Sequence, residues 1–107
     1  MSGTESSIAI MFHYVYILKS LKKQGWRYIG STSNLKQRVE EHNRKENVST
    51  KPYAPFQLIF YEAYLHKADA IRRERYLKTN KGAQVVRQML KEYLHQDSRN
   101  INRTSST

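Results

Sequence analysis

The stretch GWRYIGSTSNLKQRVEEHN, from Gly25 to Asn43, decides the fold of this chain. Its first part, residues 26–31, is rich in aromatic and β-branched side chains and is predicted to form a strand. Polar residues follow, and Asn34 with Gln37 three positions later has the pattern of a helix N-cap and capping box. Residues 35–45 are then predicted to be helical, so a strand leads directly into a helix.

The segments on either side supply two more strands and two more helices. Residues 13–20, HYVYILKS, are predicted to be a strand buried on both faces, because their apolar centre is unbroken. They lie close enough to residues 26–31 to form an antiparallel hairpin with them. A third strand is predicted at residues 56–64, and helical patterns fall at residues 66–78 and 83–95. The predicted fold is a small α/β (α+β) domain, a three-stranded antiparallel sheet with flanking helices in the order β-β-α-β-α-α.

Length and composition set the class of protein. The 107 residues suit one domain, and we expect a flexible leader at residues 1–12, the domain at 13–95 and a disordered tail at 96–107. The chain has no cysteine, which excludes disulfides and thiolate zinc sites and makes a cytoplasmic setting the default. No apolar run approaches the roughly 18 residues that span a membrane.

Charge is the clearest global signal. Nineteen Lys and Arg residues stand against nine Asp and Glu residues, which gives a formal net charge of +10. An excess of this size points to a polyanionic partner, most often nucleic acid. The alternatives are that the charge serves solubility, or that the chain is a structural or ribosome-associated basic protein.

The predicted helix at 35–45 carries two groups that suit phosphate chemistry. Leu35 and Val39 form its apolar stripe, and Arg38 and His42 lie beside that stripe, four residues apart on one face. Both would sit at the rim of the contact between helix and sheet. Two interpretations are open: a pair of active-site groups, or an arginine that extends its charge to the surface beside an ordinary boundary histidine.

Glu74 occupies the middle of an apolar stripe, between Ala70 and Leu77 at helical spacing. A buried carboxylate is unfavourable unless a cation or hydrogen-bond donors meet it. An arginine of the surrounding RRER could be that partner, or the carboxylate could be a metal ligand or general base in a half-buried cleft. Basic residues that could hold a phosphate backbone surround it: Lys67, Arg72, Arg73, Arg75, Lys78 and Lys81.

Tyr16 and Tyr28 lie in the two strands of the predicted hairpin and could face one cleft. A phenol can hold a water or take part in proton transfer, although aromatic filling of the sheet is the simpler explanation in a chain with eight tyrosines. Gly30, at the end of the second strand, permits a positive φ or the close approach of a substrate backbone. A plain strand end before a turn would also explain it.

Taken together, these motifs resemble the GIY-YIG endonuclease superfamily. The segments are VYI at residues 15–17, YIG at 28–30, NLKQRVEEH at 34–42 and RRERYLK at 72–78. The resemblance covers roughly residues 13–94. It is nearest to the small stand-alone, single-domain members and to the nuclease domain of the excision-repair subunit UvrC.

The resemblance implies a set of catalytic residues. Tyr16 and Tyr28 correspond to the tyrosines of the first and second motifs, and either would position or deprotonate the attacking water. Arg38 corresponds to the family's helix arginine, which stabilises charge on the phosphate. Glu74 corresponds to the glutamate that holds a divalent cation, Mg²⁺ or Mn²⁺. His42 matches a histidine found one turn after the arginine in some members.

The resemblance also has departures. Gly30 matches the motif glycine, but Ser31 follows it where other members carry a lysine. The family's late asparagine has no clean match, Asn80 being the nearest. The residues expected to contact nucleic acid are Gly30, Ser31, Lys67, Arg72, Arg73, Arg75, Lys78 and Lys81.

The function that follows from this resemblance is metal-dependent, structure-selective or non-specific cleavage of DNA, with RNA possible, a role in DNA repair and a possible repair-protein partner. The alternative is a catalytically silent nucleic-acid-binding module on the same fold.

Overall fold

The structure is a computed structural model that describes the backbone of residues 10–105 and the side chains of residues 10–98. The predicted leader at 1–12 therefore lies mostly outside the described residues, and so do the last two residues of the predicted tail.

A three-stranded antiparallel sheet organises the first part of the chain, as predicted. The strands lie in the order β2-β1-β3, so the first strand is central. The elements along the chain are β1 (His13–Ser20), β2 (Arg27–Thr32), α2 (Leu35–Asn43), a 3-10 turn η1 (Lys51–Tyr53), β3 (Phe56–Tyr64), α3 (Lys67–Leu77), α4 (Asn80–Met89) and α5 (Lys91–Ser105).

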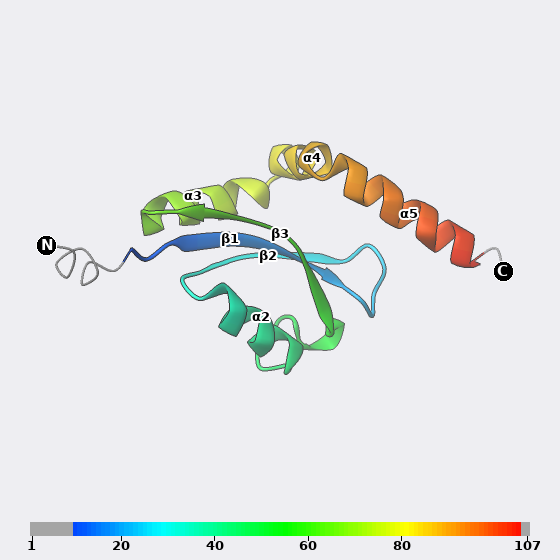
Figure 1. Ribbon diagram of the computed structural model, residues 1–107, viewed down its shortest axis with the longest axis horizontal. Helices are drawn as coiled ribbons and strands as arrows, with labels where there is room; N and C mark the ends of the chain where they lie inside the picture. Colours follow the sequence, from blue (N-terminus) through cyan, green and yellow to red (C-terminus); the bar gives the residue numbers. More distant parts are fainter. Residues whose placement is uncertain (1–9, 106–107) are drawn as a thin grey trace, which may run out of the picture. The chain divides into compact units, whose positions relative to one another are not determined.

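The centre of β1 is the core of the sheet. All four residues from Val15 to Leu18 are fully buried, because α2 lies on one side of the sheet and residues 67–74 of α3 on the other (Figure 1). Tyr16 and Leu18 face α2 and pack with the buried Phe56. The predicted burial of this strand on both faces is confirmed.

Helix α2 is fixed at both ends by asparagines. Asn34 caps its start: the Asn34 Oδ1 accepts from the backbone N–H of Gln37 at 3.2 Å, and its Nδ2 donates to the Gln37 Oε1 at 3.0 Å. The predicted cap is confirmed. The Gln37 side chain, however, accepts from the side-chain amide of Asn34 and not from its backbone N–H, as a capping box would require. At the other end the Asn43 Oδ1 accepts from the backbone N–H of Phe56 at 2.6 Å. The helix is thus tied to the start of β3.

The chain after α3 differs from the prediction of one helix at 83–95. Helix α4 begins at Asn80, because the Thr79 hydroxyl caps it and accepts from the backbone N–H of Gly82 at 3.0 Å. Residues 79–82, which lie between the two predicted helices, are therefore the N-cap and first turn of α4. A second helix, α5, continues to Ser105, although a disordered tail is expected from residue 96. A helix closes its backbone hydrogen bonds locally and needs no packing partner to do so.

The chain divides into two compact units, Met1–Glu74 and Arg75–Thr107. The sheet, α2 and most of α3 form the first unit, and α4 and α5 lie in the second. All five residues predicted to be catalytic belong to the first unit. In the part of the chain that the structure describes, no helix is long and apolar enough to cross a membrane.

Candidate active site

A buried tyrosine–histidine pair joins the sheet to α2. The Tyr16 hydroxyl lies 2.9 Å from His42 Nε2, and both side chains have 0% of their surface exposed. The interpretation of His42 as a boundary histidine is therefore wrong. Leu35 and Val39 of the apolar stripe are only partly buried against the same core, because α2 turns its His42 edge toward β1.

A third residue completes the hydrogen bonding of His42. The Thr50 Oγ1 lies 2.9 Å from His42 Nδ1 and donates to the backbone carbonyl of Asn47 at 3.4 Å. With its proton used there, Thr50 accepts from Nδ1–H. Nε2 is then the unprotonated nitrogen, which accepts from the Tyr16 hydroxyl. Thr50 is fully buried, and no sequence pattern identifies it, because it lies in the loop after α2.

Tyr28 faces the same side of the sheet as Tyr16. Tyr16 pairs with Gly30 and Leu18 pairs with Tyr28 in the antiparallel register, so the two phenols are diagonal neighbours. Their ring centroids are 6.2 Å apart, and the Tyr28 ring lies 5.0 Å from that of His42. The predicted common face is confirmed. Tyr28 is only half-buried, so it is the tyrosine of this pair that reaches solvent.

Gly30 leaves room for the Tyr16 phenol. A Cβ at residue 30 would lie 2.6 Å from the Tyr16 hydroxyl oxygen and 2.8 Å from Cε2 of Tyr28. Its φ is not positive, in contrast to that of Gly25 in the hairpin turn at 83°. Gly30 is also buried. The glycine is therefore needed for close packing of the two tyrosines, and neither a left-handed backbone nor an approaching substrate explains it.

Arg38 lies at the solvent edge of this cluster. Its Nη1 donates to the Glu41 Oε1 at 3.0 Å, and 35% of its side chain is exposed. The guanidinium also lies beside the Tyr16 hydroxyl, where its charge opposes the rise in the pKa of that phenol. One face of α2 thus presents a cation that Glu41 holds beside Tyr16.

The titration of the buried pair reflects these neighbours. Burial raises the pKa of Tyr16 to about 12, with Tyr28 adding to the rise and the neighbouring Arg38 opposing it. Burial, followed by the positive charge of Arg38, holds the pKa of His42 below its usual value. At neutral pH both groups are therefore uncharged, which the tautomer derived above requires.

Ser31 meets the predicted glutamate. Its hydroxyl donates to the Glu74 Oε1 at 2.6 Å. Other members of the resembled family carry a lysine at this position, whereas Ser31 supplies a hydroxyl. Glu74 is half-buried, and it lies within electrostatic reach of Tyr16, whose pKa is raised by burial first and by Glu74 to a smaller extent. Ser31 pairs with Val15, so this contact lies on the α3 face of β2, and the tyrosines lie on its α2 face.

The donor set around Glu74 fits a hard divalent cation. The described residues contain no group of three or more His, Cys, Asp or Glu side chains arranged to hold a metal. A single carboxylate with a neighbouring hydroxyl suits Mg²⁺, which keeps several of its waters and needs few protein ligands. A cavity of about 210 Å³ adjoins Ser31, and Lys67 also lines it.

The other predicted nucleic-acid contacts are more dispersed than the sequence suggests. Arg72 bonds Asp69 at 2.9 Å and Arg73 bonds Glu62 at 2.6 Å. Four of the candidates are exposed and belong to the second unit: Arg75, Lys78, Lys81 and Asn80.

Comparison with known proteins identifies the family of this chain. Residues 12–89 match the family described as the GIY-YIG catalytic domain. A UPF0213 protein of Staphylococcus aureus (strain Mu3) is 38% identical over 68 residues, which are 63% of this chain and 80% of that protein. UPF0213 protein SAV0488 of S. aureus strain Mu50 gives the same values. The solution structure of UPF0213 protein BH0048 from Bacillus halodurans is 29% identical, with a TM-score of 0.47 over 74% of this chain and 85% of that one. The chain therefore belongs to the GIY-YIG family and carries that family's catalytic domain, a nuclease fold.

Proposed function

We propose that this protein is a metal-dependent endonuclease that hydrolyses phosphodiester bonds in DNA. The observation that carries the proposal is the buried hydrogen-bond chain from Tyr16 through His42 to Thr50, with Arg38 at its solvent end. A core that served packing alone has no need of these polar groups, because apolar side chains of the same shape can replace a buried hydrogen-bonded pair at little or no cost in stability. Arg38 lies beside this chain of bonds, with 35% of its side chain exposed, where a phosphate can reach it.

Arg38 is the group that stabilises the transition state. Water attack on phosphorus places extra negative charge on the phosphoryl oxygens before the bond to the leaving oxygen breaks. A guanidinium held by Glu41 and lying beside Tyr16 needs little reorganisation to meet that charge. Its planar fork suits two phosphoryl oxygens at once.

Tyr28 positions the attacking water. It has exposed surface, whereas the fully buried Tyr16 has none. Tyr16, His42 and Thr50 are accordingly positioning residues: they hold Arg38 and the Tyr28 ring and do not touch the substrate. The high pKa of Tyr16, caused chiefly by burial, keeps its hydroxyl protonated as a donor to His42.

Glu74 would hold the divalent cation, Mg²⁺ or Mn²⁺. The Ser31 hydroxyl bonds Oε1 and fixes the orientation of the carboxylate. A cation bound there supplies Lewis-acid polarisation of the phosphate and neutralises charge on the leaving oxygen.

Binding of the nucleic acid rests on the phosphate backbone. The net charge of +10 and the exposed Lys67, Arg75, Lys78 and Lys81 provide contacts that carry no sequence information. Affinity should therefore fall steeply with salt, and selection should follow the shape of the substrate. A role in DNA repair, alone or with a partner protein, is consistent with such selection.

To test the proposal, the protein is incubated with labelled single-stranded, duplex and branched DNA, and with RNA of the same sequence. Each substrate is tried in Mg²⁺, in Mn²⁺ and in EDTA. Products should form with either cation and be absent in EDTA. Salt-sensitive binding with no cutting under any of these conditions would contradict it and favour the catalytically silent binding module.

A further inference from the structure

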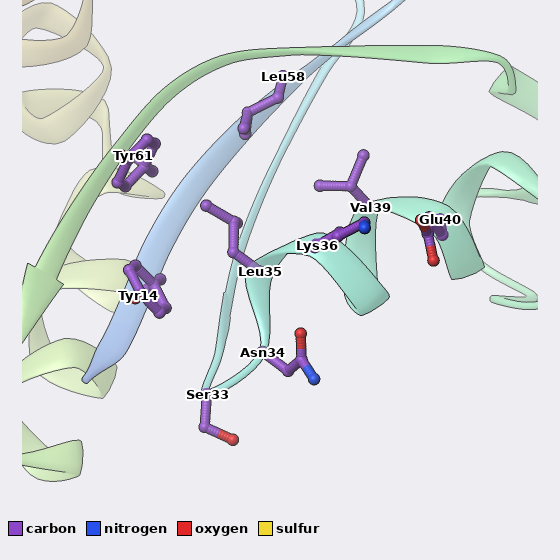
Figure 2. Close-up of a pocket in the computed structure, with 9 residues that line it drawn as sticks. All are labelled: Tyr14, Ser33, Asn34, Leu35, Lys36, Val39, Glu40, Leu58 and Tyr61. Carbon is purple, nitrogen blue, oxygen red and sulfur yellow. The ribbon is translucent and has the colours of Figure 1, made fainter. Parts of the chain in front are cut away.

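A second cavity opens on the α2 side of the sheet, beside the candidate active site. It encloses about 600 Å³ between β1, β3 and the first turns of α2 (Figure 2), a volume typical of sites for small ligands. Figure 2 shows Leu35 and Leu58 pointing toward each other across it, with two tyrosine rings at one end. The lining residues are Tyr14, Ser33, Asn34, Leu35, Lys36, Val39, Glu40, Leu58 and Tyr61.

The two tyrosines form an aromatic wall that is incompletely covered. Tyr14 and Tyr61 meet edge to face, with ring centroids 5.8 Å apart and an angle of 68°. Tyr61 keeps 54% of its surface exposed. No described residue hydrogen-bonds the hydroxyl of either ring. A solvated aromatic face beside an apolar floor is suited to a planar ring that stacks on it.

This wall lies directly beside the residues assigned to catalysis. Tyr61 pairs with Tyr16 across the strands, and Tyr14 precedes Tyr16 by two residues on the same face of β1. Two residues of a strand span about 7 Å. The cavity therefore adjoins the part of the sheet that carries Tyr16, and Arg38 lies beside that tyrosine.

The rim of the cavity has the charges that a nucleotide needs. Lys36 is exposed and makes no ion pair with any described residue, so its ammonium group can meet a phosphate. Glu40 carries a negative charge on the same rim, and its Oε1 lies 3.9 Å from Arg44 Nη1. Its carboxylate would repel phosphate, but it can accept from the exocyclic amine of cytosine. The Ser33 hydroxyl, also on the rim, can donate or accept.

We propose that this cavity receives one unpaired nucleobase of the strand that is cleaved. The base stacks on Tyr61 and Tyr14, and Lys36 contacts the adjoining phosphate. The inference rests on the proposed nuclease function and narrows its substrate to strands with an unpaired base beside the scissile bond. A base within a duplex is stacked and paired, so it would have to leave the helix to enter.

Binding in EDTA tests the cavity without any need for cleavage. We would measure the affinity of the full chain for a short single-stranded DNA and for versions that each lack one base. One abasic position should weaken binding about tenfold, the scale of losing a stacked base. In Tyr61→Leu, the intact strand should bind about tenfold more weakly, and loss of that same base should have no further effect. Since Tyr61 is exposed, this variant should fold normally, which its melting curve will verify.

Tyr76→Leu is the matched control, because Tyr76 is an exposed tyrosine, at 38%, on a different element. It should keep the full sensitivity to the abasic position. The proposal is overturned if Tyr61→Leu keeps that sensitivity too, or if all abasic positions weaken the wild-type complex equally. Failure of cleavage in Mg²⁺ with base-sensitive binding intact would instead count against the nuclease assignment alone.

Discussion

The Tyr16 hydroxyl lies 2.9 Å from His42 Nε2, and neither side chain has any exposed surface. The hydrogen-bond chain extends from His42 to Thr50, and Arg38 lies beside its other end at Tyr16. Each polar group in it therefore has a partner, as burial demands. This arrangement makes the orientation of Arg38 depend on residues that never touch the substrate, and that dependence leads to most of the predictions below.

Acidification should weaken the fold through His42. Burial, and then Arg38, lower the pKa of this histidine, so below the usual value of about 6.5 the unfolded chain binds more protons than the folded one. The stability that neutral His42 contributes is thus complete above that pH and is lost as the pH falls through the lowered value. Urea unfolding across this range should show a steeper loss for the wild type than for His42→Gln. Equal slopes would mean that the pKa of His42 is the same in the folded and the unfolded chain.

Thr50→Val should disturb the histidine without changing the shape of the core. It removes the hydroxyl that accepts from Nδ1–H and leaves a buried donor without a partner, at a cost of about 1–3 kcal/mol in the free energy of unfolding. Nitrogen NMR of His42 should show a mixed tautomer, and cleavage should slow. Thr50→Ser keeps the hydroxyl and should retain the Nδ1–H tautomer and most of the rate. Identical spectra for the valine variant and the wild type would exclude the assigned role.

Gly30→Ala should displace the Tyr16 phenol. The new Cβ would lie 2.6 Å from its oxygen, and overpacking of this kind lowers the free energy of unfolding by about 1–3 kcal/mol. Combining Gly30→Ala with Tyr16→Phe removes the nearest atom, so the double variant should lose less stability than the sum of the two single variants. Strict additivity in denaturant unfolding would show that the contact relaxes by another route. Neither Gly30 variant should cleave at the wild-type rate.

Arg38→Ala should lower the cleavage rate at saturating substrate by roughly 10²–10³, the effect of losing one preorganised donor to the transition state. Arg38→Lys should recover little, because an ammonium lacks the planar fork. Arg44→Ala is the control: Arg44 directly follows α2 and pairs with Glu46 at 2.7 Å, so its loss should leave the rate unchanged. Weaker binding with a normal rate at saturation would make Arg38 a phosphate anchor.

The elements that local pattern determines were predictable from the sequence. The strands at residues 13–20 and 56–64 have the predicted bounds, because their aromatic and β-branched runs end at clear polar or proline boundaries. The common face of Tyr16 and Tyr28 followed from the short hairpin alone. The division between α4 and α5 at Leu90 was not predictable, since the apolar spacing continues across it.

The contacts that complete the site depend on tertiary folding and were not predictable. Ser31 and Glu74 are 43 positions apart, and no local pattern relates them. Helical spacing placed His42 beside the apolar stripe, but it could not predict the rotation of α2 about its axis that turns His42 toward the sheet. Thr50 gained its role only because its loop folds under the end of α2. The resemblance to the family assigned catalytic roles to particular residues, and the structure supplies the hydrogen bonds between them.

Mg²⁺-dependent cleavage by Glu74→Gln, measured beside Glu62→Gln, tests the central claim most directly. Glutamine keeps the shape of Glu74 and an oxygen to accept from Ser31, but it removes the charge that would hold the cation. Glu62 is a carboxylate of similar burial that pairs with Arg73 in the same unit, so its change to glutamine controls for loss of a negative charge. We expect no products from Glu74→Gln, products from Glu62→Gln and the wild type, and equal DNA binding by all three in EDTA. Undiminished cleavage by Glu74→Gln would contradict the assignment of this site as a metal-dependent nuclease centre.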